Sequence, residues 1–205
     1  YYSDFLWRYD PPGPGDKGHD LRMAFPENGG IKQGLYMPDL FTKAALSFIQ
    51  INHSDQFNHY RPFFLFLSYT NPDANNEEAQ RPGNGMQVPR DGQYANEPWP
   101  SPEKSKAAMI TRLDADIGRL LDQLEKFKIE TNTVIFFTSD NGPHAEDCFN
   151  LNFFKSAGPL LGIKPELHQV AGADQAGAGE QFSVGAMGFP ADGGGHCDDE
   201  NAQEH

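Results

Sequence analysis

A carboxylate, an amide and an imidazole stand close together in the segment 140–144, Asp-Asn-Gly-Pro-His, which follows directly on the apolar run 134–137. The carboxylate of Asp140 and the amide carbonyl of Asn141 are hard oxygen donors, the type of ligand that Ca²⁺ and Mg²⁺ prefer. Two oxygen ligands do not make a site by themselves, and the same pair suits a simple Asx turn. The spacing alone therefore leaves both a cation site and a turn open.

These side chains can act together only if the apolar run ends at a ligand-binding edge. Residues 62–70 and 133–138 are both short, apolar and without polar alternation. That pattern is typical of buried strands in a parallel sheet covered by helices on both faces. In open α/β sheets, ligands bind beyond the carboxyl ends of the strands. We therefore expect 62–70 and 133–139 to be neighbouring strands of one sheet, with Asp140 and Asn141 pointing into a cleft at its edge.

Two further segments carry helical periodicity. In 37–53, Pro38 and Asp39 are start signals, and the apolar positions that recur at helical spacing are Phe41, Ala44, Ala45, Phe48 and Ile49. The clearest helix is 103–127, which Ser101 can cap. Its charged side chains are expected on a solvated face, and its apolar stripe consists of Ala107, Ile110, Leu113, Ile117, Leu120, Leu121 and Leu124.

The order of these elements is helix, strand, loop, helix, strand, which predicts an α/β domain with a partial mixed or parallel sheet flanked by helices. Residues 1–35 read as irregular connection, and the polar, proline-rich 71–100 as a long loop. The chain has 205 residues, which is enough for one domain with a core.

Charge and composition limit the classes of partner. Sixteen Lys and Arg stand against 29 Asp and Glu, a formal net charge of −13. This balance argues against nucleic acid and anionic lipid as partners, because both bind preferentially to basic surfaces. No stretch approaches the ~20 apolar residues of a membrane span, and the first residues do not resemble a signal peptide. The two cysteines, Cys148 and Cys197, form neither a disulfide framework nor a CxxC metal pattern.

Several motifs together resemble the sulfatases, in particular the arylsulfatases, which belong to the alkaline phosphatase-like superfamily. In chain order they are YMPDLFTKAALSFI, RPFFLFLSYTNPDANNE, AAMITRLDADIGRLLDQLEK, FFTSDNGPHAE and FFKSAGPLLGIK. The similarity covers 30–164, and the start more weakly. Because the motifs occur in the family's order, the resemblance is more specific than any one of them. It implies an alkaline phosphatase-like α/β fold.

The resemblance also implies a chemistry and residue roles. Sulfatases hydrolyse sulfate esters with a formylglycine, and a divalent cation, usually calcium, holds this group and the sulfate. Asp140 and Asn141 match two ligands of that cation. Lys164 matches a lysine that contacts the sulfate, and His144, near the same strand end, is assigned to substrate binding. The implied activity is that of a metal-dependent sulfuric ester hydrolase acting on a sulfate ester in the full-length parent protein. By family resemblance, that parent protein would be secreted, periplasmic or lysosomal.

Three departures from the family pattern bear on activity. The formylglycine motif, Cys or Ser-x-Pro-Ser-Arg, is missing, as is the early Asp-Asp pair that completes the cation site. Asp73 stands where the family usually has a histidine. After Lys164 the family's Tyr-Glu-Gly-Gly segment is missing. We therefore interpret 1–164 as a partial sulfatase domain, an internal piece that is inactive by itself. The alternative is a truncated or degenerate product with at most weak cation binding.

The last residues, 165–205, change abruptly to Gly, Ala, Gln and Asp with no clear period. One interpretation is a disordered tail. Another comes from codons: read one nucleotide later, the segment from Met187 permits WDFLPTAA, and the segment from Gln169 permits WPGRIKPG after a Lys or Arg. Both are sulfatase-like and both use the same shifted frame. We therefore expect a change of reading frame near Lys164.

Overall fold

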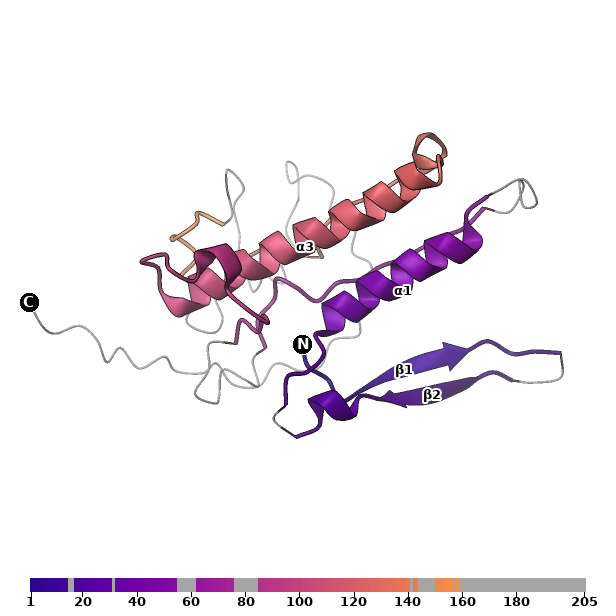
Figure 1. The fold of residues 1–205 in the computed structure, drawn as a ribbon, viewed down its shortest axis with the longest axis horizontal. Helices are drawn as coiled ribbons and strands as arrows, with labels where there is room; N and C mark the ends of the chain where they lie inside the picture. Colours follow the sequence, from indigo (N-terminus) through magenta and orange to yellow (C-terminus); the bar gives the residue numbers. More distant parts are fainter. Residues whose placement is uncertain are drawn as a thin grey trace, which may run out of the picture. The chain divides into compact units, whose positions relative to one another are not determined.

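The computed structural model describes residues 1–14, 17–30, 32–54, 62–75, 85–140, 142–143, 150–156 and 158. Its main elements are strands β1 (Phe5–Asp10) and β2 (His19–Ala24) and helices α1 (Met37–Asn52) and α3 (Ser101–Lys126), shown in Figure 1. Short 3₁₀ turns lie at Pro26–Asn28, Gly92–Tyr94 and Glu130–Asn132. Contacts divide the chain into two compact units.

The first unit consists of Tyr1–Asn71, Val88–Arg90 and Ile110–Asn132, and the second of Pro72–Gln87, Asp91–Met109 and Thr133–His205. No helix among the described residues has the length and apolar character that crossing a membrane requires.

The N-terminal segment contains an antiparallel hairpin, so the expectation that 1–35 is irregular was wrong. The strands β1 and β2 pair in register from Phe5 with Ala24 to Asp10 with His19. Gly18 has a φ of +71° in the returning turn, and an added Cβ there would lie 2.6 Å from the Tyr9 hydroxyl. The glycine thus allows both the left-handed backbone and the close approach of the tyrosine. Proline and glycine in 11–18 suggested loop, whereas they connect two strands.

The hairpin is joined to the start of α1 by one buried amide. The Asn28 Nδ2 donates to the carbonyls of Ser3 and Leu35 at 2.9 and 2.8 Å. Its Oδ1 accepts the N–H groups of Gly34 and Leu35 at 3.0 and 2.7 Å. This side chain therefore satisfies four backbone groups in two segments at once, which a buried loop requires.

Helix α1 confirms the prediction from periodicity. Pro38 lies in its first turn, where its missing N–H costs nothing, and Asp39 places a negative charge near the positive end of the helix dipole. Ala45 and Ile49 are buried as the pattern required, while Ala44 is exposed. Ile49 forms a core with Leu124 and Ile129, against which partly buried side chains pack, namely Phe63, Leu65, Leu120 and Phe127.

Helix α3 also confirms its prediction, but its apolar stripe is buried unevenly. Leu124 is buried and Leu113, Ile117 and Leu120 are half-buried, whereas Ile110 and Leu121 are exposed. Residues 101–109 of the helix belong to the second unit and the rest of the helix to the first. The stripe therefore does not have the same neighbours along its whole length. The periodicity identified the helix correctly, and the tertiary contacts decided which of its residues are covered.

The C-terminus of α3 ends in a Schellman motif. The Ile129 N–H donates to the Leu124 carbonyl at 3.1 Å, and the Lys128 N–H donates to the Glu125 carbonyl at 2.8 Å. Lys128 has a φ of +58°, the left-handed conformation that this motif requires and that glycine adopts most easily. The buried contact between Ile129 and Leu124 completes the motif.

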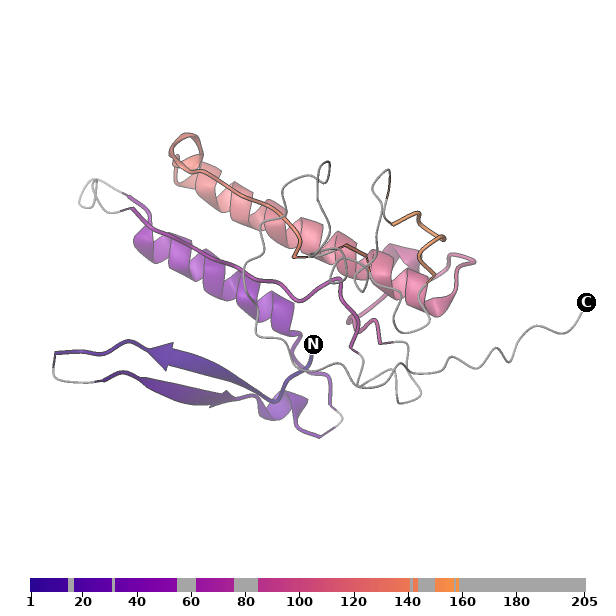
Figure 2. The same ribbon diagram turned by 180° about the vertical axis from the view of Figure 1, so that it is seen from behind.

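Segments 62–70 and 133–139 were expected to be strands, and that expectation was wrong for this chain: neither is assigned as a strand. A β-strand is defined by a hydrogen-bonded neighbour, and among the described residues the ladder of β1 and β2 is the only one. Segment 62–70 nevertheless lies along α1 (Figures 1 and 2). Its burial alternates residue by residue, with 63, 65, 67 and 69 half-buried and their neighbours exposed. Among the described residues, the expected α/β fold is therefore only partly formed.

The left-handed Lys128 yields a stability prediction. Replacing Lys128 by Gly should raise the free energy of unfolding by about 0.5–1 kcal/mol, because the strain of a side chain at positive φ exceeds the entropic cost of glycine. The matched control is Lys43→Gly at an exposed position inside α1, which should lower it by about 1 kcal/mol. Urea denaturation measures both, and a destabilised Lys128→Gly variant would contradict the assigned cap.

Candidate functional site

Asp140 is the one predicted site residue that the structure describes. It lies at a bend directly after 133–139 and its side chain is exposed. Among the described residues, no hydrogen bond or ion pair involves its carboxylate. Asn141, His144 and Lys164 lie outside the described residues. The structure therefore shows an accessible carboxylate where the sequence predicts a cation ligand, and leaves the other three positions as predictions.

The donor type fits calcium, since Asp140 offers an exposed, hard oxygen. Calcium takes about six to eight oxygen ligands, however, so one or two residues supply only part of a coordination sphere. Within the part of the chain that the structure describes, no group of three or more His, Cys, Asp or Glu side chains could hold a metal ion. These residues match a cation site in chemical type without completing one.

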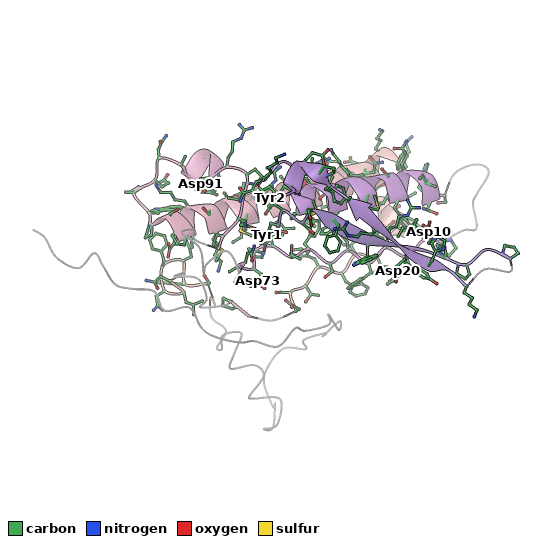
Figure 3. The ribbon with its side chains drawn as sticks, turned by 90° about the horizontal axis from the view of Figure 1, so that it is seen from below. Tyr1, Tyr2, Asp10, Asp20, Asp73 and Asp91 are labelled. Carbon is green, nitrogen blue, oxygen red and sulfur yellow. The ribbon has the colours of Figure 1, made fainter. Side chains whose placement is uncertain are left out.

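A second polar site lies in the unit that contains the first turns of α3. Glu103 is 1% exposed and Lys106 is 4% exposed. The Asn150 N–H donates to Glu103 Oε1 at 3.1 Å, while the buried Oε2 has no hydrogen-bond partner among the described residues. Beside them, the Ser105 hydroxyl donates to Asp91 Oδ1 at 2.8 Å (Asp91 is labelled in Figure 3). The start of the helix is thus held by buried charges and hydrogen bonds.

Lys106 is the basic member of this cluster. Burial lowers the pKa of its ammonium group to about 8, and the carboxylates of Asp73 and Glu103 oppose that shift. Asp73, labelled in Figure 3, is half-buried, and its Oδ1 accepts the Ala74 N–H at 3.0 Å. Asp73 is the residue that replaces the histidine expected from the sulfatase pattern. In this chain its charge interacts with a buried lysine.

The sequence had placed the charges of this helix on a solvated face, which was wrong for Glu103 and Lys106. Both are buried, and so is Asp116, which pairs with Arg119 at 2.9 Å. A signal was present: Glu103, Lys106 and the fully buried Met109 are spaced by three residues, so they lie on one side of the helix. The apolar stripe had been started at Ala107, and the charged residues before it were read as solvent-facing.

A third polar cluster belongs to the other unit and is structural in character. Arg112 donates from Nε and one terminal nitrogen to both oxygens of Asp39, at 2.8 and 2.5 Å. Its guanidinium carbon lies 5.4 Å from the ring centre of Tyr36. Tyr1 and Tyr2, labelled in Figure 3, pack their rings against the same tyrosine. Burial raises the pKa values of the Tyr2 and Tyr36 hydroxyls, which keeps both neutral.

Comparison with known families identifies the class of protein. The family model described as Sulfatase matches residues 7–182, a stretch that includes the segment 140–144 and Lys164. The chain therefore belongs to the sulfatase family. Membership implies an alkaline phosphatase-like α/β fold, of which the described residues show one two-stranded sheet and two long helices.

Individual relatives agree with this assignment. An arylsulfatase of Hemicentrotus pulcherrimus is 31% identical over 112 residues, which are 55% of this chain and 16% of the relative. The N-acetylgalactosamine-6-sulfatase of Mus musculus is 29% identical over 52% of this chain and 17% of its own length. The N-acetylgalactosamine-6-O-sulfatase of Bacteroides thetaiotaomicron is 28% identical over 57% and 19%. The chain thus spans less than a fifth of the length of these relatives, and no solved structure matches it.

The buried lysine yields a pH prediction. Because the pKa of Lys106 is about 8 in the folded state and 10.5 otherwise, the unfolded chain binds more protons between these values. The free energy of unfolding should therefore rise with pH from about 8 to about 10. The variant Lys106→Met should lack this part of the rise.

Denaturation at pH 7.5, 8.5 and 9.5 measures the effect below the range in which the tyrosines titrate. Lys104→Met, two residues earlier and less buried, is the matched control and should keep the wild-type slope. Equal slopes in the wild type and in Lys106→Met would contradict the assignment of a buried, partly deprotonated amine.

Proposed function

We propose that this chain carries part of the active site of a sulfuric ester hydrolase. Asp140 and Asn141 bind a divalent cation, calcium by family resemblance, and Lys164 and His144 bind the sulfate group. The single observation that carries the proposal is the Asp-Asn-Gly-Pro-His segment at 140–144, at the end of an apolar run and inside the region that the Sulfatase family model matches. The exposed carboxylate of Asp140 supports it.

Each proposed residue has a distinct physical task. A bound cation would neutralise charge on the sulfate and on the transition state of its transfer. Asp140 and Asn141 would hold that cation through hard oxygen atoms. The Lys164 ammonium would donate to sulfate oxygens, as a compact positive charge does for oxyanions. The relatives' names divide between aryl and N-acetylgalactosamine-6 sulfate esters, so the proposed substrate class stays at sulfate esters.

The second candidate is a chain that binds a cation weakly and catalyses nothing alone. The sequence observation that favours it is the missing formylglycine motif. A cation and a lysine stabilise charge, but hydrolysis by this route also needs an activated nucleophile that attacks the sulfur. The two candidates are compatible if the activity belongs to a longer sulfatase chain.

Calcium affinity tests the metal assignment. The wild-type chain should bind calcium weakly, with a dissociation constant on the order of 1 mM or higher, because Asp140 and Asn141 supply only a small part of the about six to eight oxygen ligands that calcium takes. Asp140→Ala should abolish this binding. Asp114→Ala, which removes an exposed carboxylate on α3, should leave it unchanged. Calorimetric titration with calcium chloride distinguishes these outcomes, and tight binding that survives Asp140→Ala would overturn the assignment.

The type of anion tests the reaction class. With calcium present, 4-nitrophenyl sulfate should bind to the chain more tightly than 4-nitrophenyl phosphate, and Lys164→Ala should weaken the sulfate complex about tenfold or more, as expected when one charged hydrogen bond is lost. Preference for the phosphate ester would favour a phosphatase of the same superfamily and contradict the proposal.

Turnover is a separate expectation. The chain alone should release no 4-nitrophenol from 4-nitrophenyl sulfate above the uncatalysed rate, since no formylglycine motif is present to supply the nucleophile. Absorbance at alkaline pH after a long incubation provides the measurement. Release that disappears in Asp140→Ala would show that the chain has a nucleophile of its own and that the expected inactivity is wrong.

A further inference from the structure

The sequence contains three Asn-Gly pairs, at 28–29, 84–85 and 141–142. In such a pair the backbone nitrogen of the glycine can attack the side-chain amide of the asparagine, because no Cβ on the glycine hinders the approach. Asparagine followed by glycine therefore deamidates readily in unfolded chains. Of the three pairs, the one at 28–29 lies entirely within the described residues, and its Asn28 is the buried amide that joins the hairpin to the start of α1.

In the folded chain, both reacting groups of this pair are already engaged. The Asn28 side chain is 2% exposed, and its amide makes four hydrogen bonds, to Ser3 and to 34–35. The Gly29 N–H donates to the Pro26 carbonyl at 3.1 Å. Attack by the Gly29 nitrogen on Asn28 therefore requires both sets of hydrogen bonds to break first.

The surrounding backbone leaves little room for a partial rearrangement. The Asn28 N–H donates to the Phe25 carbonyl at 2.9 Å, which holds the residue in the 3₁₀ turn Pro26–Asn28. Gly34 passes so close to this turn that an added Cβ on it would lie 2.7 Å from the Glu27 carbonyl oxygen. The reaction thus depends on a local opening of this end of the hairpin.

We infer that Asn28–Gly29 is a deamidation site that the folded chain keeps closed and that reacts when this end of the hairpin opens. In the reaction, the Gly29 nitrogen forms a bond to Cγ of Asn28. The bond from Cγ to Nδ2 breaks, and Nδ2 leaves as ammonia with the proton of the Gly29 N–H. Water then opens the cyclic imide at one of its two carbonyls. One water is consumed, one ammonia is released, and aspartate or isoaspartate remains at position 28.

Neither product restores the original contacts. Aspartate presents an oxygen where Nδ2 of Asn28 donated to the carbonyls of Ser3 and Leu35, and it places a charge at a buried position. Isoaspartate adds one atom to the main chain inside the 3₁₀ turn. The modification therefore loosens the hairpin from the segment before α1, and it cannot reverse when the chain closes again.

Two backbone hydrogen bonds remain near the modified residue. The Phe25 N–H donates to the Asp4 carbonyl at 2.6 Å, and the Met37 N–H donates to the Tyr1 carbonyl at 2.9 Å. They report on the loosening, because their amide hydrogens exchange only when the hydrogen bonds open. The inference is separate from the proposed hydrolysis, since deamidation needs neither a cation nor a sulfate ester.

Reaction rates test the closed state. The full 205-residue chain is incubated at mildly alkaline pH, folded in buffer or unfolded in guanidinium chloride, and peptide mass spectrometry quantifies aspartate and isoaspartate at position 28. Asn28 should react about a hundredfold or more faster in the unfolded chain, because four buried hydrogen bonds hold it in the folded one. Gly29→Ala should slow the reaction in the unfolded chain, since the methyl group hinders the nitrogen. Gly29 has a φ of −61°, which alanine adopts without strain.

A variant that carries the product tests the consequence. Asn28→Asp should speed the exchange of the Phe25 and Met37 amide hydrogens about tenfold or more. The matched control is Asn52→Asp, which alters an amide that donates to the Phe48 carbonyl at the end of α1, and it should leave both exchange rates unchanged. The deamidated fraction of the wild-type chain should show the same faster exchange as Asn28→Asp. Circular dichroism should show similar helix content in all these proteins.

Three results would overturn the inference. The first is an equal rate of Asn28 deamidation in the folded and the unfolded chain. The second is an unfolded Gly29→Ala chain that reacts as fast as the wild type, which would exclude attack by the Gly29 nitrogen. The third is wild-type exchange of the Phe25 and Met37 amides in Asn28→Asp, which would mean that the product leaves the link intact.

Discussion

A strand depends on neighbours in a way that a helix does not, and this requirement governs the molecule. Each extended residue presents an N–H and a C=O outward, and these groups need partners from another segment. Segment 62–70 has a helix beneath it and alternating burial, yet no ladder forms among the described residues. In the apolar run 133–139, every residue except Thr133 is exposed. The sheet expected from family membership is therefore the part of the fold least developed in this chain.

Helices α1 and α3 form under the same conditions because their backbone hydrogen bonds are internal. Their ends are also satisfied locally: Lys128 adopts the left-handed conformation that closes α3. Side chains then determine how they pack in the first unit, where Ile49 meets Leu124 and Arg112 pairs with both oxygens of Asp39. The half-exposed Asp39–Arg112 pair adds orientation more than stability, since solvent screens its charges.

Whether the candidate site can form depends on whether the sheet forms. Groups at a strand's carboxyl end converge only when neighbouring strands end at the same edge. Asp140 is exposed and accessible, but among the described residues no group of three or more His, Cys, Asp or Glu side chains could hold a metal ion. Buried polar groups lie instead at the start of α3, where Glu103 accepts one hydrogen bond from the Asn150 N–H and Lys106 is also buried. That cluster makes Asp73 a partner of a lysine, which is a different environment from that of a histidine facing a sulfate.

The sequence by itself determined the family, the two long helices and the candidate residues Asp140, Asn141, His144 and Lys164. Helical periodicity is local, and the motif order is visible in one dimension, so neither needed a structure. The tertiary structure decided the rest. It paired β1 with β2 across a proline- and glycine-rich connection, and it left 62–70 and 133–139 without ladders. It also buried Glu103 and Lys106, because whether a charge faces solvent depends on segments distant in sequence, such as Asn150 and Asp73. Pairing and burial are properties of contacts between segments, and a residue pattern constrains them only when both partners are known.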